Sequence, residues 1–351
     1  MNGDHSARGL VAVDPAWSAV HSLHYQLLSS QQHMLLDHQR TGAYHRGITR
    51  NTSDFAGKTV LDVGAGSGIL SLFAAQAGAR KVYAVDENVP ECARTLVASN
   101  ELSGRVEVIQ SRLADLRLDE KVDVIVSEPW GFFLFHERMV EAFILARDRF
   151  LKAGGRLFPG TGRVFLAPFS DADLHEARTS ALSFWSQANF YGVDLRAMTS
   201  RAADEIFSMP ALGYVEPKSL VAPPSVRAFD FERMPLAELA RITLPVAFAA
   251  EREATVHGLA GWFEVAFEGS TERVVLSTAP HSVETHWSQL RFVFLEPLLL
   301  RAGQKVEGTL TLSANEHSSY TALFEGEVEG YGPLVPQTFH IEHYIPADEP
   351  P

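Results

Sequence analysis

Apolar runs alternate with amphipathic segments in the first half of the chain. Between Asn51 and Phe158, short apolar stretches with strand character are separated by helix-like periods. This alternation is typical of a doubly wound α/β sheet. The expected strands are Lys58–Val63, Lys81–Asp86, Val106–Gln110 and Val122–Val126, and the expected helices are Ile69–Ala77, Pro90–Ser99 and one after Glu137 that ends near Leu151. A turn at Lys152–Gly155 is expected to follow that last helix.

A helical pattern precedes this region, and a β-rich pattern follows it. Leucines and Met34 recur at helical intervals from Trp17 to about Arg50, whereas residues 1–16 look like a tail. Beyond Phe158, short alternating runs predict a β-barrel or sandwich. The expected strands there are Arg163–Leu166, Val226–Phe231, Thr255–Phe267, Arg273–Thr278, Arg291–Phe294, Val306–Leu312 and Tyr320–Val328. We therefore predict three parts, residues 1–50, 51–160 and 161–351, with an aromatic-rich helical insertion at about 176–212.

Composition and charge narrow the function classes. A chain of 351 residues suits two domains, and its formal charge of −13 disfavours nucleic acid as a partner while suiting a cationic substrate. The single cysteine, Cys92, excludes an internal disulfide and a zinc-ligand set, so no metal site is expected. No apolar run reaches the ~20 residues that span a bilayer, and no secretory pattern opens the chain. We expect a cytoplasmic protein without a membrane partner.

A glycine-rich segment, Val60–Gly68, joins the first expected strand to a helix. Its glycines allow close backbone approach to a ligand, and an acid about 20 residues later is suited to ribose hydroxyls. Asp86 ends the next strand and occupies that place. An ordinary tight turn is the alternative, but the combined pattern favours a nucleotide-type cofactor.

Two glutamates bracket the segment that leaves the Val122–Val126 strand. Glu128 and Glu137 lie where an open α/β sheet places its ligand crevice. Two converging carboxylates need a cation between them, and the planar guanidinium fork matches them best. Two solvated surface glutamates are the alternative.

Four motifs together resemble the protein arginine methyltransferases, most closely their coactivator-associated branch. They are Asp37–Tyr44 (DHQRTGAY), Val60–Asp86, Ser127–Met139 (SEPWGFFLFHERM) and Thr285-His286-Trp287, and the resemblance runs from about Ser22 past Leu312. It implies a Rossmann-like class I S-adenosylmethionine (SAM) methyltransferase domain, then a β-barrel-like domain with an inserted dimerisation arm. It also implies SAM as cofactor and a homodimer.

The resemblance assigns roles to individual residues. Glu128 and Glu137 would clamp the substrate guanidinium, and His286 would pair with Asp37; either glutamate or His286 could take the proton. The implied cofactor-binding residues are Arg40, Asp62, Gly64, Gly66, Gly68, Asp86 and Ala114. The implied residues of the methyl-acceptor pocket are Met34, Tyr25, His21 and Trp287.

The substrate class is open at this point. Family aromatics over the acceptor entrance are replaced by His21 and Ser22. Their polarity slightly favours free L-arginine or another small guanidino compound, with monomethylation, over an arginine-containing peptide. A catalytically silent SAM-binding scaffold is an alternative of another class, and methylation of a small amine would leave the paired glutamates without a matching fork.

Overall fold

The computed structural model describes residues 11–14, 25–88 and 90–341, and every structural statement refers to these residues. Three helices open the described fold: α2 (Leu28–Leu36), α3 (His38–Thr49) and α4 (Thr52–Phe55). Asp37 separates α2 from α3, because its carboxylate caps α3 by accepting the Arg40 N–H at 2.9 Å. The predicted helical segment is therefore divided at Asp37.

A five-stranded parallel sheet follows, in the order β3-β2-β1-β4-β5. Its strands are β1 (Thr59–Val63), β2 (Lys81–Asp86), β3 (Val106–Gln110), β4 (Val122–Ser127) and β5 (Leu151–Phe158). Its connecting helices are α5 (Ile69–Gln76), α6 (Pro90–Ser99) and α7 (Val140–Phe150). All of β1 is buried, as its apolar sequence predicts. The strand order reverses between β1 and β4, because β2 and β3 lie on one side of β1 whereas β4 and β5 lie on the other. The loops after β1 and β4 therefore border one ligand crevice.

The expected turn at Lys152–Gly155 is wrong. These residues belong to β5, where Leu151 pairs with Val122 and Arg156 pairs with Val124. Between these two pairs β5 advances by five residues and β4 by only two, so β5 contains a bulge. Gly154 and Gly155 lie in this bulge, and a sequence with two glycines resembles that of a turn.

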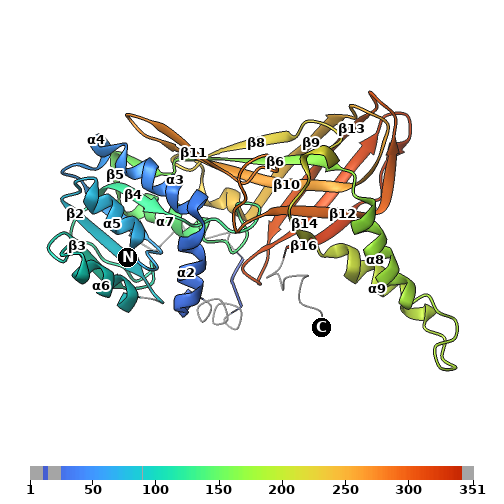
Figure 1. Ribbon diagram of the computed structural model, residues 1–351, viewed down its shortest axis with the longest axis horizontal. Helices are drawn as coiled ribbons and strands as arrows, with labels where there is room; N and C mark the ends of the chain where they lie inside the picture. The colour runs from blue at the N-terminus through green and yellow to red at the C-terminus, as the bar shows by residue number, and fades with distance from the viewer. Residues whose placement is uncertain (1–10, 15–24, 89, 342–351) are drawn as a thin grey trace, which may run out of the picture.

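The second half is built mainly from antiparallel strands, and Figure 1 shows them as a long body beside the parallel sheet. They are β6 (Thr161–Phe169), β7 (Ala211–Gly213), β8 (Ser225–Asp230), β9 (Arg241–Ala249), β10 (Ala254–Glu268), β11 (Arg273–Ser277), β12 (Gln289–Leu300), β13 (Lys305–Ala314), β14 (Tyr320–Val328), β15 (Gly332–Pro333) and β16 (Gln337–Ile341). Short 3-10 turns lie at Pro217–Ser219 and Leu236–Ala240. Two sheets result, and Ser225 of β8 links them by hydrogen bonds to both backbone groups of Ala247 in β9.

A helical arm projects from this body. It consists of α8 (Ala172–Phe184), a 3-10 turn (Arg196–Met198) and α9 (Thr199–Ser208), and its tip points away from every other element in Figure 1. Aromatic side chains remain exposed there, and Tyr191 is 94% accessible. Exposed aromatics on a protruding element are typical of a partner surface.

A buried asparagine joins the two halves of the molecule. The side chain of Asn51 donates to the carbonyl oxygens of Gly47 and Glu272 and accepts from the N–H groups of Thr271 and Glu272, all at 2.8–2.9 Å. The β10–β11 hairpin is thereby fixed to the end of α3. This joint sets how the barrel faces the crevice of the parallel sheet. None of the described helices is long and apolar enough to cross a membrane.

Candidate functional site

The loop after β4 has an unusual backbone. Phe133, Leu134, Glu137 and Arg138 have φ values of 55°, 71°, 73° and 56°. Side-chain-bearing residues adopt this left-handed region at a cost of about 1–3 kcal/mol each, and such residues concentrate at functional sites. The loop also folds tightly on itself, because a Cβ at Gly131 would lie 2.1 Å from the His136 carbonyl oxygen.

Glu128 begins this loop and already holds a guanidinium. Its Oε2 accepts from Arg40 Nε at 2.7 Å and lies 2.6 Å from Arg40 Nη2, with both side chains less than 10% exposed. The Trp130 N–H donates to its other oxygen at 3.3 Å. A buried, charge-assisted contact of this kind holds the carboxylate in one orientation.

Glu137 lies at the far end of the loop. The hydroxyl of Tyr25 donates to its Oε2 at 2.8 Å. Burial raises the pKa of Glu137 to about 7; the Tyr25 hydrogen bond opposes that rise, and the charge of Glu128 adds to it. The influence of Glu128 shows that the loop brings the two carboxylates close enough to interact. The Tyr25 hydroxyl keeps its proton, because burial and the charge of Glu137 raise its pKa.

Asp37 and His286 form a second pair. His286 Nδ1 lies 2.7 Å from Asp37 Oδ2, and the His286 backbone N–H donates to the same oxygen at 3.0 Å. Burial alone would raise the pKa of Asp37, but the hydrogen bonds from His286 and from the Arg40 N–H outweigh it and lower the pKa to about 2. The carboxylate therefore stays ionised and orients the imidazole ring.

The other predicted pocket residues have different surroundings. The Trp287 indole is buried and donates to the Trp130 carbonyl oxygen at 2.9 Å, so it fixes the backbone of the β4 loop. Met34 is half-buried, and its carbonyl oxygen accepts from Arg40 Nη1 at 3.3 Å. His21 lies outside the described residues.

The glycine loop is held by residues from two directions. The Gly66 N–H donates to Asp86 at 2.9 Å, and the Ser67 N–H donates to the Gln31 side-chain oxygen at 3.0 Å. Gly66 has φ +53°, and a Cβ there would lie 2.8 Å from that Gln31 oxygen. Gly64 and Gly68 also have positive φ values. The sequence pattern did not identify Gln31 as a site residue, because it is a polar residue within a leucine-rich helix.

Asp62 and Ala114 complete the predicted cofactor set. Asp62 accepts from the Ser71 hydroxyl at 2.7 Å, while its Oδ1 has no partner among the described residues. Burial raises the pKa of Asp62 to about 7. Ala114 lies in the loop after β3, and Arg149 of α7 donates to the carbonyl oxygens of Leu113, Ala114 and Leu116. The sequence did not single out Arg149.

These residues suit SAM. The orphaned Asp62 oxygen, the carboxylate of Asp86 at the ribose position and the glycine loop form one crevice edge at the ends of β1 and β2. A buried acceptor without a donor is expected to receive one from a ligand. When bound, SAM supplies a methyl group on a sulfonium centre. The described residues contain no group of three or more His, Cys, Asp or Glu side chains able to hold a metal.

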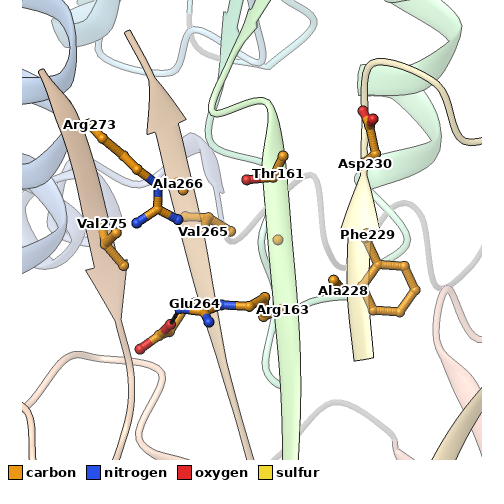
Figure 2. A pocket seen from close by; sticks show the side chains of 11 residues that line it. Thr161, Arg163, Ala228, Phe229, Asp230, Glu264, Val265, Ala266, Arg273 and Val275 are labelled. Carbon is orange, nitrogen blue, oxygen red and sulfur yellow. Dashed lines mark hydrogen bonds and ion pairs between the residues drawn. The ribbon is translucent and has the colours of Figure 1, made fainter. Parts of the chain in front are cut away.

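Surface hollows also lie outside this crevice, and two of them differ in character. A groove of about 850 Å³ lies beside the Asp37–His286 pair and is bordered by α2, α3, Tyr214 and the segment before His286. Figure 2 shows the other, about 330 Å³, across β6, β8, β10 and β11. Its Arg163 and Arg273 are already paired with Glu264 and Glu268. The groove beside His286 is therefore the better entrance for a substrate.

Comparisons with known proteins identify the family of the chain. The family described as "Arginine methyltransferase oligomerization subdomain" matches residues 160–324, and "Ribosomal protein L11 methyltransferase (PrmA)" matches residues 49–128. The chain is 47% identical over 311 residues to "Probable histone-arginine methyltransferase CARM1" of Oryza sativa subsp. japonica, covering 88% of this chain and 59% of that protein. It is 41% identical over 307 residues to "Histone-arginine methyltransferase CARMER" of Drosophila ananassae, covering 87% of this chain and 58% of that protein. The chain thus spans about three-fifths of the length of these curated relatives.

Two solved structures of arginine methyltransferases match this chain over almost their whole length. A crystal structure of Arabidopsis thaliana protein arginine methyltransferase 10 in an open conformation has a TM-score of 0.84 at 33% identity, covering 92% of this chain and 100% of that one. The Trypanosoma brucei PRMT1 enzyme–prozyme heterotetrameric complex with AdoHcy has a TM-score of 0.82 at 31% identity, covering 90% of this chain and 99% of that one.

Proposed function

The chain belongs to the protein arginine methyltransferase family, and from that premise we propose that it transfers a methyl group from SAM to a terminal guanidino nitrogen of an arginine residue in a protein. The observation that carries the proposal is the guanidinium that Glu128 already binds. Two N–H groups of Arg40 share one oxygen of Glu128 within a buried crevice. A carboxylate oriented in this way can also bind the planar fork of an incoming arginine.

Glu128 has an electrostatic role in this mechanism. A carboxylate that accepts two N–H bonds draws the positive charge toward one side of the guanidinium, so the nitrogen on the other side becomes a better nucleophile. The pKa of a guanidinium exceeds about 12, so losing its proton before attack is costly. The proton therefore leaves during or after methyl transfer.

Glu137 is a better proton acceptor than Asp37, the other carboxylate of the predicted catalytic set whose pKa is shifted. Its pKa of about 7 allows it to take a proton near neutral pH, whereas the pKa of Asp37 is about 2. His286 is the second candidate, because Asp37 holds its ring by Nδ1. The pH–rate profiles of Glu137→Gln and His286→Gln distinguish the two candidates. Only the variant that lacks the true proton acceptor loses the fall in rate at low pH that protonation of that acceptor causes.

A protein substrate replaces the slight preference for free L-arginine that the sequence suggested. The matched relatives are named histone-arginine methyltransferases, which favours arginine within a polypeptide. The preference for a small substrate depended on His21 and Ser22, which lie outside the described residues. The groove beside His286 also has a volume of about 850 Å³, which is large enough to hold more than one amino acid.

The protein is proposed to act as a head-to-tail homodimer. The exposed arm carries Phe184 and Tyr191, and α2 exposes Leu28 and Leu36 on the separate parallel-sheet half. Burial of apolar surface on both elements would stabilise a symmetric pair in which each arm covers the other copy's helices. The family description of residues 160–324 as an oligomerization subdomain supports this arrangement.

The test supplies methyl-labelled SAM with core histones, an arginine-rich peptide, its lysine-substituted counterpart and free L-arginine. Mass analysis should find methyl groups on arginine in the histones or the peptide. Glu128→Gln should reduce the rate at least about 100-fold, while the exposed Glu325→Gln should not. Turnover of free L-arginine alone would refute the protein substrate, and SAM binding without any turnover would favour the silent scaffold.

A further inference from the structure

Arg138 follows Glu137 directly and is almost fully buried. Its side chain is 3% exposed. Both residues have left-handed backbone conformations, with φ values of 73° and 56°. Two adjacent side-chain-bearing residues keep such conformations only when their surroundings hold them there. The contacts of Arg138 therefore bear directly on where the Glu137 carboxylate lies.

The Arg138 guanidinium connects three separate parts of the chain. Its Nε donates to Glu141 Oε1 at 2.7 Å, and its Nη2 donates to Glu141 Oε2 at 3.2 Å. Its Nη1 donates to the Asn315 carbonyl oxygen in the turn between β13 and β14, at 2.7 Å. Its Nη2 also donates to the Val11 carbonyl oxygen at 2.7 Å. Helix α7, the barrel and the N-terminal segment thus meet at one side chain.

The N-terminal segment has a second attachment nearby. The Asp14 N–H donates to the Glu316 carbonyl oxygen at 2.8 Å. Residues 11–14 therefore lie along the β13–β14 turn, anchored at Asp14 by the turn itself and at Val11 by Arg138. The next described residue is Tyr25, whose hydroxyl binds Glu137. The N-terminal part of the chain thus contacts two adjacent residues of the loop, Glu137 through Tyr25 and Arg138 through Val11.

We propose that Arg138 is a positioning residue, and that its guanidinium couples docking of residues 11–14 to the placement of the Glu137 carboxylate. This inference rests on the proposed function, since Glu137 matters only if an acceptor arginine binds there. When the segment is docked, four N–H groups of Arg138 are satisfied and the left-handed loop is fixed. When it is not, one buried N–H loses its acceptor and the loop loses one of its three anchors.

Lysine cannot replace Arg138 in this role. A lysine has three donors on a single nitrogen, so it cannot reach acceptors that lie on different sides of a planar fork. A general packing role would tolerate lysine better than a positioning role would. The chain also provides a matched control in Arg147, which is 11% exposed and donates to the Phe231 and Met234 carbonyl oxygens at 2.7 and 2.8 Å, with no hydrogen bond to residues 128–138 in the described part of the chain.

The experiment compares Arg138→Lys, Arg138→Gln, Arg147→Gln and a chain lacking residues 1–14. Each is assayed for SAM affinity by calorimetry and for kcat, KM and the pH profile of kcat on an arginine-rich peptide. We expect both Arg138 variants to reduce kcat about 100-fold and to shift the Glu137 limb of the pH profile, with SAM affinity within about threefold of wild type. The truncated chain should show a defect of the same kind, and truncation should add little to Arg138→Gln, because Arg138→Gln already removes the Val11 contact through which the segment acts.

Several results would overturn the inference. One is a kcat of Arg138→Lys within threefold of the wild-type value. Another is a loss of kcat in Arg147→Gln as large as that in Arg138→Gln. A third is a combined variant, truncated and carrying Arg138→Gln, whose loss of kcat is the product of the two separate losses. If Arg138→Gln does not fold, the truncated chain decides alone, because it keeps Arg138 with its Glu141 and Asn315 partners and removes the Val11 carbonyl oxygen. Failure of the proposed function looks different, since the wild-type chain itself would then not methylate arginine.

Discussion

Replacing Glu137 by glutamine is expected to stabilise the folded chain relative to wild type as the pH rises, even though it should slow methyl transfer. The folded state holds the Glu137 proton until pH about 7, whereas the unfolded chain releases it near 4.5. Between these values the folded state binds more protons, so a rise in pH lowers stability. The shift of about 2.5 pKa units corresponds to roughly 3 kcal/mol once the pH exceeds 7.

Glutamine removes this loss because it cannot ionise. Its side-chain oxygen can still accept the Tyr25 hydroxyl, so the local contact is retained. The free energy of unfolding of Glu137→Gln minus that of wild type should therefore grow by roughly 2–3 kcal/mol between about pH 5 and about pH 8.5. Any steric cost of the amide is the same at both pH values and cancels in this difference.

Urea denaturation of the cofactor-free protein at the two pH values measures this quantity, with Glu325→Gln on the exposed face of β14 as the control. The control difference should be independent of pH. A Glu137→Gln difference that is also independent of pH would refute the reasoning, because it would mean that the carboxylate is not destabilised by burial.

Two further predictions concern the joint and the arm. Asn51→Ala removes four hydrogen bonds, three to the hairpin backbone and one to the Gly47 carbonyl oxygen of α3, so urea denaturation should show a loss of about 3 kcal/mol or more, and a loss below about 1 kcal/mol would contradict the proposed joint. Tyr191→Ser removes the most exposed aromatic of the arm, so sedimentation velocity should show at least a tenfold weaker dimer, about 1.4 kcal/mol, with unchanged unfolding of each chain. An unaltered association constant would place the dimer interface elsewhere.

The sequence predicted β1 to β4 of the parallel sheet to within about a residue, because their runs are mainly apolar, whereas it replaced the start of β5 by a turn because Gly154 and Gly155 imitate one. It missed β9, where Pro245 interrupts an otherwise regular alternation of buried and exposed residues. Proline lacks the N–H that a central strand needs. Within its sheet β9 pairs only with β13, so the missing donor costs nothing there.

The N-terminal helix shows why periodicity can mislead. Its leucines predict an apolar buried face, but Leu28 is 70% exposed, whereas Ser30 and Gln31 are the buried residues. Polar side chains are buried there because the glycine loop presents N–H groups that need acceptors. A pattern rule counts only apolar positions, so it cannot find this face.

The candidate site was predictable in its residue types and not in its mutual contacts. The spacing of Glu128 and Glu137 indicated a guanidinium ligand, but it did not reveal that Arg40 occupies the first of them. The left-handed conformations at Glu137 and Arg138 were also hidden, because neither residue type signals positive φ. Long-range contacts decide both features.

The Arg40–Glu128 pair also determines which cations the crevice can select. With Glu128 neutralised by its own chain, a simple metal ion or ammonium group that enters between the two glutamates meets at most one net negative charge, that of Glu137. Removing water from such ions costs more free energy than this weak attraction supplies. A planar fork can still share the carboxylate through additional directed hydrogen bonds. The crevice therefore discriminates among cations by shape, and ionic strength should affect its selectivity less than its overall affinity.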